Sequence, residues 1–324
     1  MTEFTEIPVL DASPLSHGAP EEMASAFAKA YGETGFAYVV NHGVPDGLVE
    51  RVFAASAAFH GLPRDQKVAV ALNANHRGFI PINTSTDVNS KLADVKRPNQ
   101  SESFMMMRED NIDAPDVQAG AYLAGPNLWP DLAGFREDVT AYHDALTDLG
   151  RRLMEVAALS VGADPADLAP AFQRPTTWLR LLYYPPTDPA EADLYGSAPH
   201  TDFGCLTILA QDEVGGLQVQ TPAGAWIDAP RIEGAFVVNV GDMLHRWSNG
   251  RLRSTPHRVI NASGKSRYSC PFFFDPNVAT TIAPLASCVT PDRPAQFEPL
   301  VFGDFLRAEL GAGYDQHKGA GAAS

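Results

Sequence analysis

The clearest periodic pattern of apolar positions in the chain lies between residues 135 and 159. Apolar side chains recur there at alternating steps of four and three residues: Phe135, Val139, Tyr142, Leu146, Leu149, Leu153 and Val156. This spacing places them on one face of an α-helix. The stripe is short for a coiled coil, so it predicts a scaffold helix packed on a sheet. His143 lies beside the stripe and is interpreted as structural.

The first part of the chain alternates between strand-like and helix-like segments. Strands are expected over residues 7–11 and 35–44, and helices over residues 19–35 and about 45–61. This order predicts a mixed α/β region. From about residue 82 to residue 130 the chain shows little periodicity and is rich in Asn, Asp, Ser and Pro. A stretch of this length without regular structure is expected to serve as a lid or a substrate loop.

Residues 177 to about 290 consist of short β-rich segments separated by turn residues. The segments are, in order, "WLRLLYY", "CLTILAQ", "GLQVQ", "AWIDA", "AFVVNVG", "HRVI" and "RYSCPFFF". Many short strands at this spacing predict an antiparallel sandwich or barrel. A last helix is expected at "FGDFLRAEL", followed by a Gly/Ala-rich tail that we expect to be disordered.

Composition and charge limit the cellular compartments and the classes of partner that can be expected. The 324 residues are 45% hydrophobic, which is enough for one large domain or two. No apolar stretch approaches the ~20 residues of a membrane span, and the acidic first residues lack signal-peptide features. A cytoplasmic protein without a membrane partner is therefore expected. The net charge of −15, without a dense basic run, argues against nucleic acid as a partner. The three scattered cysteines are expected to be reduced and buried.

Two ionisable residues stand at the start of an apolar segment, in "PHTDFGCLTIL". His200 and Asp202 are two residues apart, so in a strand they would project from the same face. His257 stands at the head of another expected strand, in "STPHRVI". Two histidines and one carboxylate form the facial triad of non-haem Fe(II) oxygenases, which leaves three coordination positions open. The same three ligands also suit zinc.

An arginine and a serine follow the second histidine. Arg267 and Ser269 are again two residues apart and share a face in "RYSCPFFFD". The apolar and aromatic neighbours indicate a buried segment. A buried arginine needs an anion, and a guanidinium with a nearby hydroxyl can hold a carboxylate.

These segments together resemble a known family, the isopenicillin N synthase-like branch of the Fe(II)/2-oxoglutarate-dependent dioxygenases. The resemblance covers most of the chain and is carried by "GFAYVVNHGV", "GPNLWP", "WLRLLYYPP", "PHTDFGCLTIL", "GLQVQ", "FVVNVGDMLHRWSNGRLRSTPHRV" and "RYSCPFFFDP". It implies an α+β fold with a mainly β core, a double-stranded β-helix (jelly roll) flanked by helices. One globular unit is expected, with an N-terminal α/β region with substrate-side loops (1–130), scaffold helices (131–176), the jelly-roll core (177–290) and a C-terminal helix and tail (291–324).

The resemblance also implies an activity and its ligands. It assigns Fe(II) to His200, Asp202 and His257, and the cosubstrate 2-oxoglutarate to Arg267 and Ser269. Dioxygen and 2-oxoglutarate would be consumed, succinate and CO2 released, and a small-molecule substrate oxidised. Hydroxylation is the default outcome, and desaturation or ring closure uses the same first steps.

Three alternatives are considered. An Fe(II) oxidase that needs no 2-oxoglutarate, of the isopenicillin N synthase or aminocyclopropane-carboxylate oxidase type, keeps the same Arg-x-Ser pair. A zinc hydrolase could use the same His/Asp/His ligands. A non-catalytic binding protein would be expected to have lost a ligand or the arginine, and all of them are present.

The resemblance extends to further positions, where the match to the family is less complete. Tyr184 matches a tyrosine that contacts 2-oxoglutarate in related enzymes, although the asparagine position of that motif is Leu182 here. Asn239, in "FVVNVG", is interpreted as structural. The expected walls of the substrate pocket are Arg77, Phe79, Asn83, Phe104, Phe272 and Phe274. Arg77 could bind a substrate acid or a backbone carbonyl. The sequence defines neither the substrate nor the oligomeric state.

Overall fold

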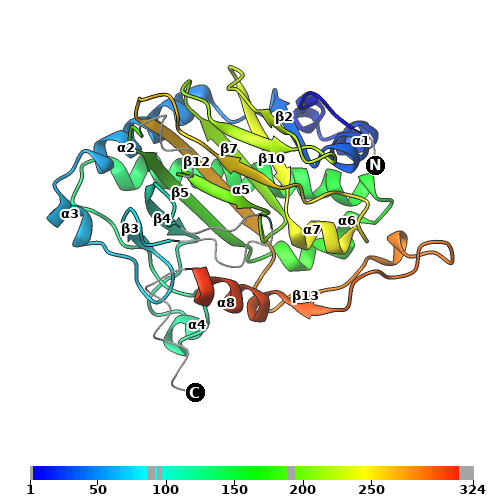
Figure 1. The fold of residues 1–324 in the computed structure, drawn as a ribbon. Coiled ribbons are helices and arrows are strands. Elements are labelled where there is room, and N and C mark those ends of the chain that lie inside the picture. Colours follow the sequence, from blue (N-terminus) through cyan, green and yellow to red (C-terminus); the bar gives the residue numbers. More distant parts are fainter. Residues whose placement is uncertain (1–2, 86–91, 93–96, 188–193, 314–324) are drawn as a thin grey trace.

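Two β-sheets form the centre of the protein (Figure 1). The structure, a computed structural model, describes residues 3–85, 92, 97–187 and 194–313. The larger sheet contains, in spatial order, β1 (Val9–Asp11), β2 (Phe36–Val40), β10 (Ala235–Val240), β7 (Leu206–Gln211), β12 (Arg267–Asp275), β5 (Thr176–Tyr184), β4 (Glu102–Met107) and β3 (Gly78–Ile80). The smaller sheet contains β6 (Ser197–His200), β11 (His257–Val259), β8 (Leu217–Gln220) and β9 (Trp226–Asp228).

Alternation along the strands of the larger sheet separates two hydrophobic cores. On β5, Leu181 belongs to an outer core and Leu182 to an inner core; on β10, Val238 is outer and Val237 is inner. Successive side chains of a strand point to opposite faces, so each strand contributes to both cores. The inner core also contains Val219 of the smaller sheet, so it lies between the two sheets. The predicted double-stranded β-helix is confirmed.

Helices cover the outer face of the larger sheet. The predicted scaffold helix is α5 (Phe135–Ser160), which runs behind the sheet in Figure 1 and buries its whole apolar stripe. Two further helices, α1 (Ala24–Glu33) and α2 (Asp46–His60), pack against it. The remaining helices are α3 (Arg64–Val68), α4 (Pro115–Gln118), α6 (Pro165–Leu168), α7 (Asp242–Trp247) and α8 (Phe302–Gly313), with 3₁₀ turns η1 (Ser13–His17), η2 (Pro20–Met23), η3 (Ala169–Phe172) and η4 (Ala286–Cys288).

The observed elements differ from the expected ones mainly where elements are short. The helix expected over residues 19–35 starts as the 3₁₀ turn η2 and continues as α1. The helices α3 and α7 and the two-stranded sheet of β13 (Thr281–Ile282) and β14 (Leu300–Val301) were not expected, because segments this short carry no periodicity. The irregular 82–130 region supplies the edge strand β4. Part of that region, and the Gly/Ala-rich tail, lie outside the described residues.

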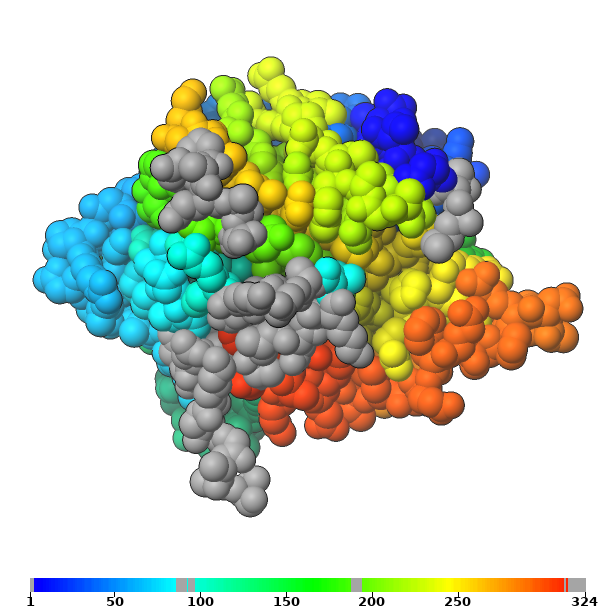
Figure 2. Space-filling view, in the orientation of Figure 1, coloured from blue at the N-terminus to red at the C-terminus, as the bar shows by residue number. Residues whose placement is uncertain are grey.

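The N-terminal region shares the larger sheet with the core strands. Its four strands β1 to β4 lie at the two edges of the sheet. Cys205, Cys270 and Cys288 are buried and free, as predicted. Figure 2 shows the C-terminal chain, orange to red, along the lower side of the molecule in this view.

No helix within the described residues combines the length and the apolar character needed to cross a membrane.

A glycine of α5 sets how closely this helix approaches the sheet. A Cβ atom at Gly150 would lie 2.6 Å from the ring of Phe274 on β12. We expect Gly150→Ala to lower the free energy of unfolding by about 1–3 kcal/mol through overpacking, against the usual preference of helices for alanine. Urea unfolding followed by circular dichroism measures this change. Gly311→Ala in α8, where nothing lies within 4 Å of the added methyl, is the control and should be neutral or stabilising.

Candidate metal and cosubstrate site

Three potential metal ligands converge between the sheets. His200 ends β6, His257 begins the neighbouring β11, and the two histidines are paired directly across the strands. The Nε2 atom of each ring lies 3.6 Å from Oδ1 of Asp202. One ligand atom from each of the three residues falls within a cluster 4.8 Å across. Two imidazole nitrogens and one carboxylate oxygen at this spacing can hold a metal ion on one face of its coordination sphere.

Backbone carbonyls fix the histidine rings in the form that binds metal. The Nδ1 atom of His200 lies 2.7 Å from the carbonyl oxygen of Ala198, and that of His257 lies 3.3 Å from the carbonyl oxygen of Thr255. A carbonyl only accepts hydrogen bonds, so each Nδ1 carries the proton. When the imidazole is neutral, as a metal ligand must be, the lone pair is then on Nε2, which faces Asp202. Such outer hydrogen bonds orient metal-binding imidazoles.

Two residues of the larger sheet hold the carboxylate of Asp202 between the two histidines. Oδ2 of Asp202 accepts hydrogen bonds from Oγ1 of Thr207 on β7, at 2.5 Å, and from Nδ2 of Asn239 on β10, at 2.7 Å. Oδ1 is thereby turned to the histidines. Burial alone would raise the pKa of Asp202, but the two histidines and these hydrogen bonds lower it below its ordinary value. The carboxylate is thus kept ionised, as a metal ligand must be.

A tight bend, and not a continuous strand, brings Asp202 to the histidines. The strand β6 ends at His200, and Asp202 lies beyond it, so the expectation that both residues share one strand is wrong. The backbone N–H of Asp242, at the start of α7, donates to the carbonyl of Asp202 and fixes the bend. The two side chains meet because the chain turns, rather than by strand alternation.

The end of β12 completes this bend. Oδ1 of Asp275 accepts the backbone N–H of Cys205 at 2.8 Å, and Oδ2 accepts the indole N–H of Trp178 at 3.0 Å. Burial raises the pKa of Asp275 to about 7, although these two hydrogen bonds oppose the shift. A Cβ atom at Gly204 would lie 1.5 Å from Oδ1 of Asp275. Only glycine fits at this position, two residues beyond Asp202.

A fully buried arginine lies on the same inner face. Nε of Arg267 donates to the carbonyl of Gly215 at 2.6 Å, and its terminal nitrogens donate to Oγ of Ser269 and Oε1 of Gln211 at 3.3 and 3.4 Å. The guanidinium lies 4.6 Å from the ring centre of Tyr184. Within the described residues no carboxylate pairs with it. A buried guanidinium with neutral partners is suited to bind a carboxylate ligand.

The four phenylalanines expected in the substrate pocket lie on the other side of the larger sheet. Phe79 and Phe104 pack against Phe59 of α2, with ring centres 5.9 and 5.0 Å away. Phe272 and Phe274 belong to the same outer core. Odd-numbered positions of β12, such as Arg267 and Ser269, face inward, so the even-numbered ones face the helices. The structure does not bring these rings to the metal ligands.

The two polar residues expected in the pocket have local partners. Arg77 is 1% exposed and donates to the backbone carbonyls of Asn75 and Leu123, which favours the second of its two proposed roles. Asn83 is exposed, and its side-chain oxygen accepts a hydrogen bond from Gln100.

Sequence reasoning missed four residues that build the site. Asn239 was interpreted as structural, yet its side chain contacts Asp202 directly. Thr207, Gln211 and Asp275 were not singled out at all. Each of the four is a polar residue that directly follows an apolar residue of its strand. That isolated polarity was the available signal.

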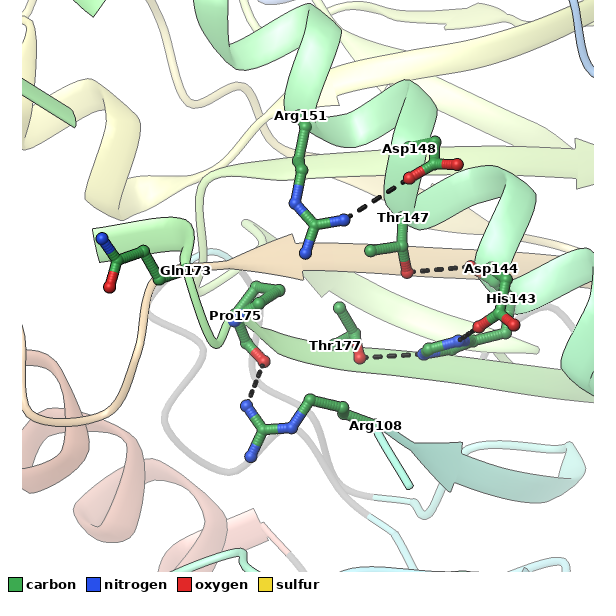
Figure 3. A pocket seen from close by; sticks show the side chains of 9 residues that line it. All are labelled: Arg108, His143, Asp144, Thr147, Asp148, Arg151, Gln173, Pro175 and Thr177. Carbon is green, nitrogen blue, oxygen red and sulfur yellow. Dashed lines mark hydrogen bonds and ion pairs between the residues drawn. The ribbon is translucent and has the colours of Figure 1, made fainter. Parts of the chain in front are cut away.

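A surface pocket of about 270 Å³ lies on the opposite, helical side of the sheet (Figure 3). Its walls are Arg108, His143, Asp144, Thr147, Asp148, Arg151, Gln173, Pro175 and Thr177. His143 is hydrogen-bonded to Thr177 at 2.9 Å, and Arg151 pairs with Asp148 at 3.4 Å. Arg108 donates to a backbone carbonyl. These polar groups are hydrogen-bonded or ion-paired within the protein, so this pocket is not a candidate for the catalytic site.

Two protein families match the chain. Residues 175–276 match the 2OG-Fe(II) oxygenase superfamily. Residues 7–132 match the family described as non-haem dioxygenase in morphine synthesis N-terminal. The first match contains every residue considered above as a metal or cosubstrate ligand.

Curated relatives and a solved structure extend these matches over nearly the whole chain. The 2-oxoglutarate-Fe(II) type oxidoreductase hxnY of Emericella nidulans is 33% identical over 323 residues, covering 96% of this chain and 91% of the relative. Homoarginine-6-hydroxylase 2-ODD-C23 of Glycine max is 32% identical, covering 95% and 97%. The crystal structure of a full-length Neurospora crassa protein in complex with alpha-KG and thymine superposes with a TM-score of 0.82, at 30% identity, covering 94% and 96%.

Replacing Asn239 with alanine removes one of the two hydrogen bonds that hold Oδ2 of Asp202. Outer partners of metal ligands typically contribute 10- to 100-fold, so we expect the affinity for Co(II), an air-stable substitute for Fe(II), to fall by roughly that factor. Calorimetric titration of the metal-free protein measures it. Asn111→Ala, at an exposed asparagine that caps its own loop, is the control. Unchanged Co(II) affinity in Asn239→Ala would show that Asp202 needs no such support.

Proposed function

The chain belongs to the 2OG-Fe(II) oxygenase superfamily, and we propose that His200, Asp202 and His257 hold its iron. The protein is an Fe(II)- and 2-oxoglutarate-dependent oxygenase, an oxidoreductase. One observation carries the assignment of the ligands: the Nε2 atoms of both histidines lie 3.6 Å from Oδ1 of Asp202, and each of the three side chains is oriented by a hydrogen bond on its far side. The donor set matches the two histidines and one carboxylate that non-haem iron prefers.

We propose that Arg267 and Ser269 hold the distal carboxylate of 2-oxoglutarate, with Tyr184 beside them. Burial of an arginine without a carboxylate partner in the described chain supports this assignment. The aromatic ring of Tyr184 stacks on the guanidinium and limits its rotation. The fork of Arg267 is thereby oriented before the ligand arrives, which reduces the entropy lost on binding.

Iron, 2-oxoglutarate and dioxygen supply the oxidising power when bound, with succinate and CO2 as products and a substrate C–H bond as the target. The residues of the chain position the iron, the cosubstrate and the substrate relative to one another. The apolar inner core, which includes Val219, Val237 and Val259, contains residues of both sheets, and we expect it to limit the access of water to the site. We propose that the substrate is a small molecule and that hydroxylation is the outcome, as the name of the Glycine max relative indicates for that enzyme.

The alternatives derived from the sequence are less well supported. Relatives named as 2-oxoglutarate-dependent enzymes, and neighbouring structures with alpha-KG bound, favour use of the cosubstrate over an oxidase that dispenses with it. The same matches disfavour a zinc hydrolase. We also propose a cytoplasmic location, supported by three buried, unpaired cysteines, which are typical of proteins in reducing compartments.

The function is tested by iron-dependent release of succinate from 2-oxoglutarate. We expect wild-type protein to bind 2-oxoglutarate anaerobically and Arg267→Gln to bind it roughly 10- to 150-fold more weakly, because charged hydrogen bonds are lost. Titration of the charge-transfer band of the Fe(II) complex measures this affinity. Arg151→Gln, which removes an arginine on the helical side of the sheet, should behave like the wild type.

Loss of 2-oxoglutarate affinity in the control as well would show a general defect. Wild-type, metal-replete protein that binds no 2-oxoglutarate and releases no succinate with any of a broad substrate panel would contradict the proposed function.

A further inference from the structure

Three inward-facing side chains of the central strands are only partly buried. They are Arg180 on β5, Leu209 on β7 and Phe273 on β12. Their inward neighbours on the same strands, such as Leu182 and Ser269, are almost fully buried. Exposure at the centre of a sheet indicates space above these positions, on the side of the metal ligands. These three residues therefore face the side of the larger sheet on which the proposed iron ligands lie, and the rest of the chain does not cover them fully.

The strand pairing places Phe273 next to a residue that holds Asp202, and Arg180 diagonally across from Phe273. Phe273 is paired with Thr207, whose hydroxyl holds Asp202, and on its other side with Trp178. Arg180 is two residues from Trp178 on the same face, so it is the diagonal neighbour of Phe273. Diagonal neighbours lie about 7–8 Å apart, within reach of long side chains.

Arg180 has few partners for its charge. One terminal nitrogen donates to the hydroxyl of Ser103 at 3.0 Å, and its Nε is buried without a hydrogen-bond partner. Within the described residues no carboxylate lies within ion-pair distance of it. Arg267, on the same face, has the same character and is proposed to bind the cosubstrate. A second arginine without a counter-ion on the same face calls for a second anion.

We propose that Arg180 binds a carboxylate of the substrate, and that the body of the substrate lies against Phe273 and Leu209. The substrate class is then a small organic acid with an apolar body. The inference rests on the proposed function, because it takes the iron and 2-oxoglutarate positions as given. Arg180 is a specificity-determining residue here: its carboxylate contact sets which end of the molecule lies far from the metal and which C–H bond faces it.

The test uses matched acids and amides as probes. Phenylacetate with phenylacetamide, benzoate with benzamide, and hexanoate with hexanamide differ in charge while keeping shape. Each is titrated anaerobically into the Fe(II)–2-oxoglutarate complex and scored by the change in its absorption spectrum. We expect the wild type to bind at least one acid roughly tenfold or more tightly than its amide. Arg180→Gln should bring that ratio to within about threefold of unity, and Arg180→Lys should retain part of it.

The affinity for 2-oxoglutarate separates the possible outcomes. We expect it to stay within about twofold of wild type in Arg180→Gln, and Arg151→Gln should keep both the 2-oxoglutarate affinity and the acid preference. Weakened 2-oxoglutarate binding in Arg180→Gln would assign Arg180 to the cosubstrate and overturn the inference. So would a wild-type enzyme that binds 2-oxoglutarate but no acid more tightly than its amide. A wild type that binds no 2-oxoglutarate would overturn the proposed function itself.

Discussion

The site depends on one constraint: the two carboxylate oxygens of Asp202 have different partners. Oδ2 is occupied by Thr207 and Asn239, so Oδ1 alone faces the two histidines. The histidines belong to the smaller sheet and the two hydrogen-bond donors to the larger one. Stripping a buried charge of its partners costs about 3–5 kcal/mol, so the carboxylate ties the sheets together. The proposed metal site thus depends on both sheets together and is formed by neither sheet alone.

Strand alternation lets one sheet serve as both scaffold and cavity wall. The outer side chains of β5 and β12, such as Leu181 and Phe274, pack under α5 in an apolar core. The inner side chains of the same strands include Arg180, Arg267 and Ser269. Because α1, α2 and α5 contribute to the outer core, the inner face can accommodate polar groups without disturbing the core that stabilises the fold. A change of one residue in register would exchange the two faces.

Elements with a long periodic pattern can be predicted from the sequence. Features that depend on which strands pair with each other are predicted poorly. The stripe of α5 could be located from periodicity alone, and the three metal ligands from residue type and order. Their local geometry could not, because the bend after His200 depends on Asp275, which lies far away in the sequence. The orientation of Phe272 was within reach, since it lies an odd number of residues from Arg267. The proposed role of Arg180 was not, because only the strand pairing places it diagonally across from Phe273, which is itself paired with Thr207.

Three buried or half-buried arginines differ in how far the chain compensates their charge. This difference separates a structural arginine from those suited to bind a ligand. Arg77 donates to backbone carbonyls and has Asp110 at 3.7 Å, so its charge is compensated within the chain. Arg267 is anchored by neutral acceptors and an aromatic ring, which fix its direction, and no carboxylate of the described residues compensates its charge. Arg180 is held by a single hydroxyl. A guanidinium that is both oriented and uncompensated gains most from an incoming anion, because little order has to be created and no internal ion pair has to be broken. By this criterion, burial alone does not identify a ligand-binding arginine; the missing counter-ion does.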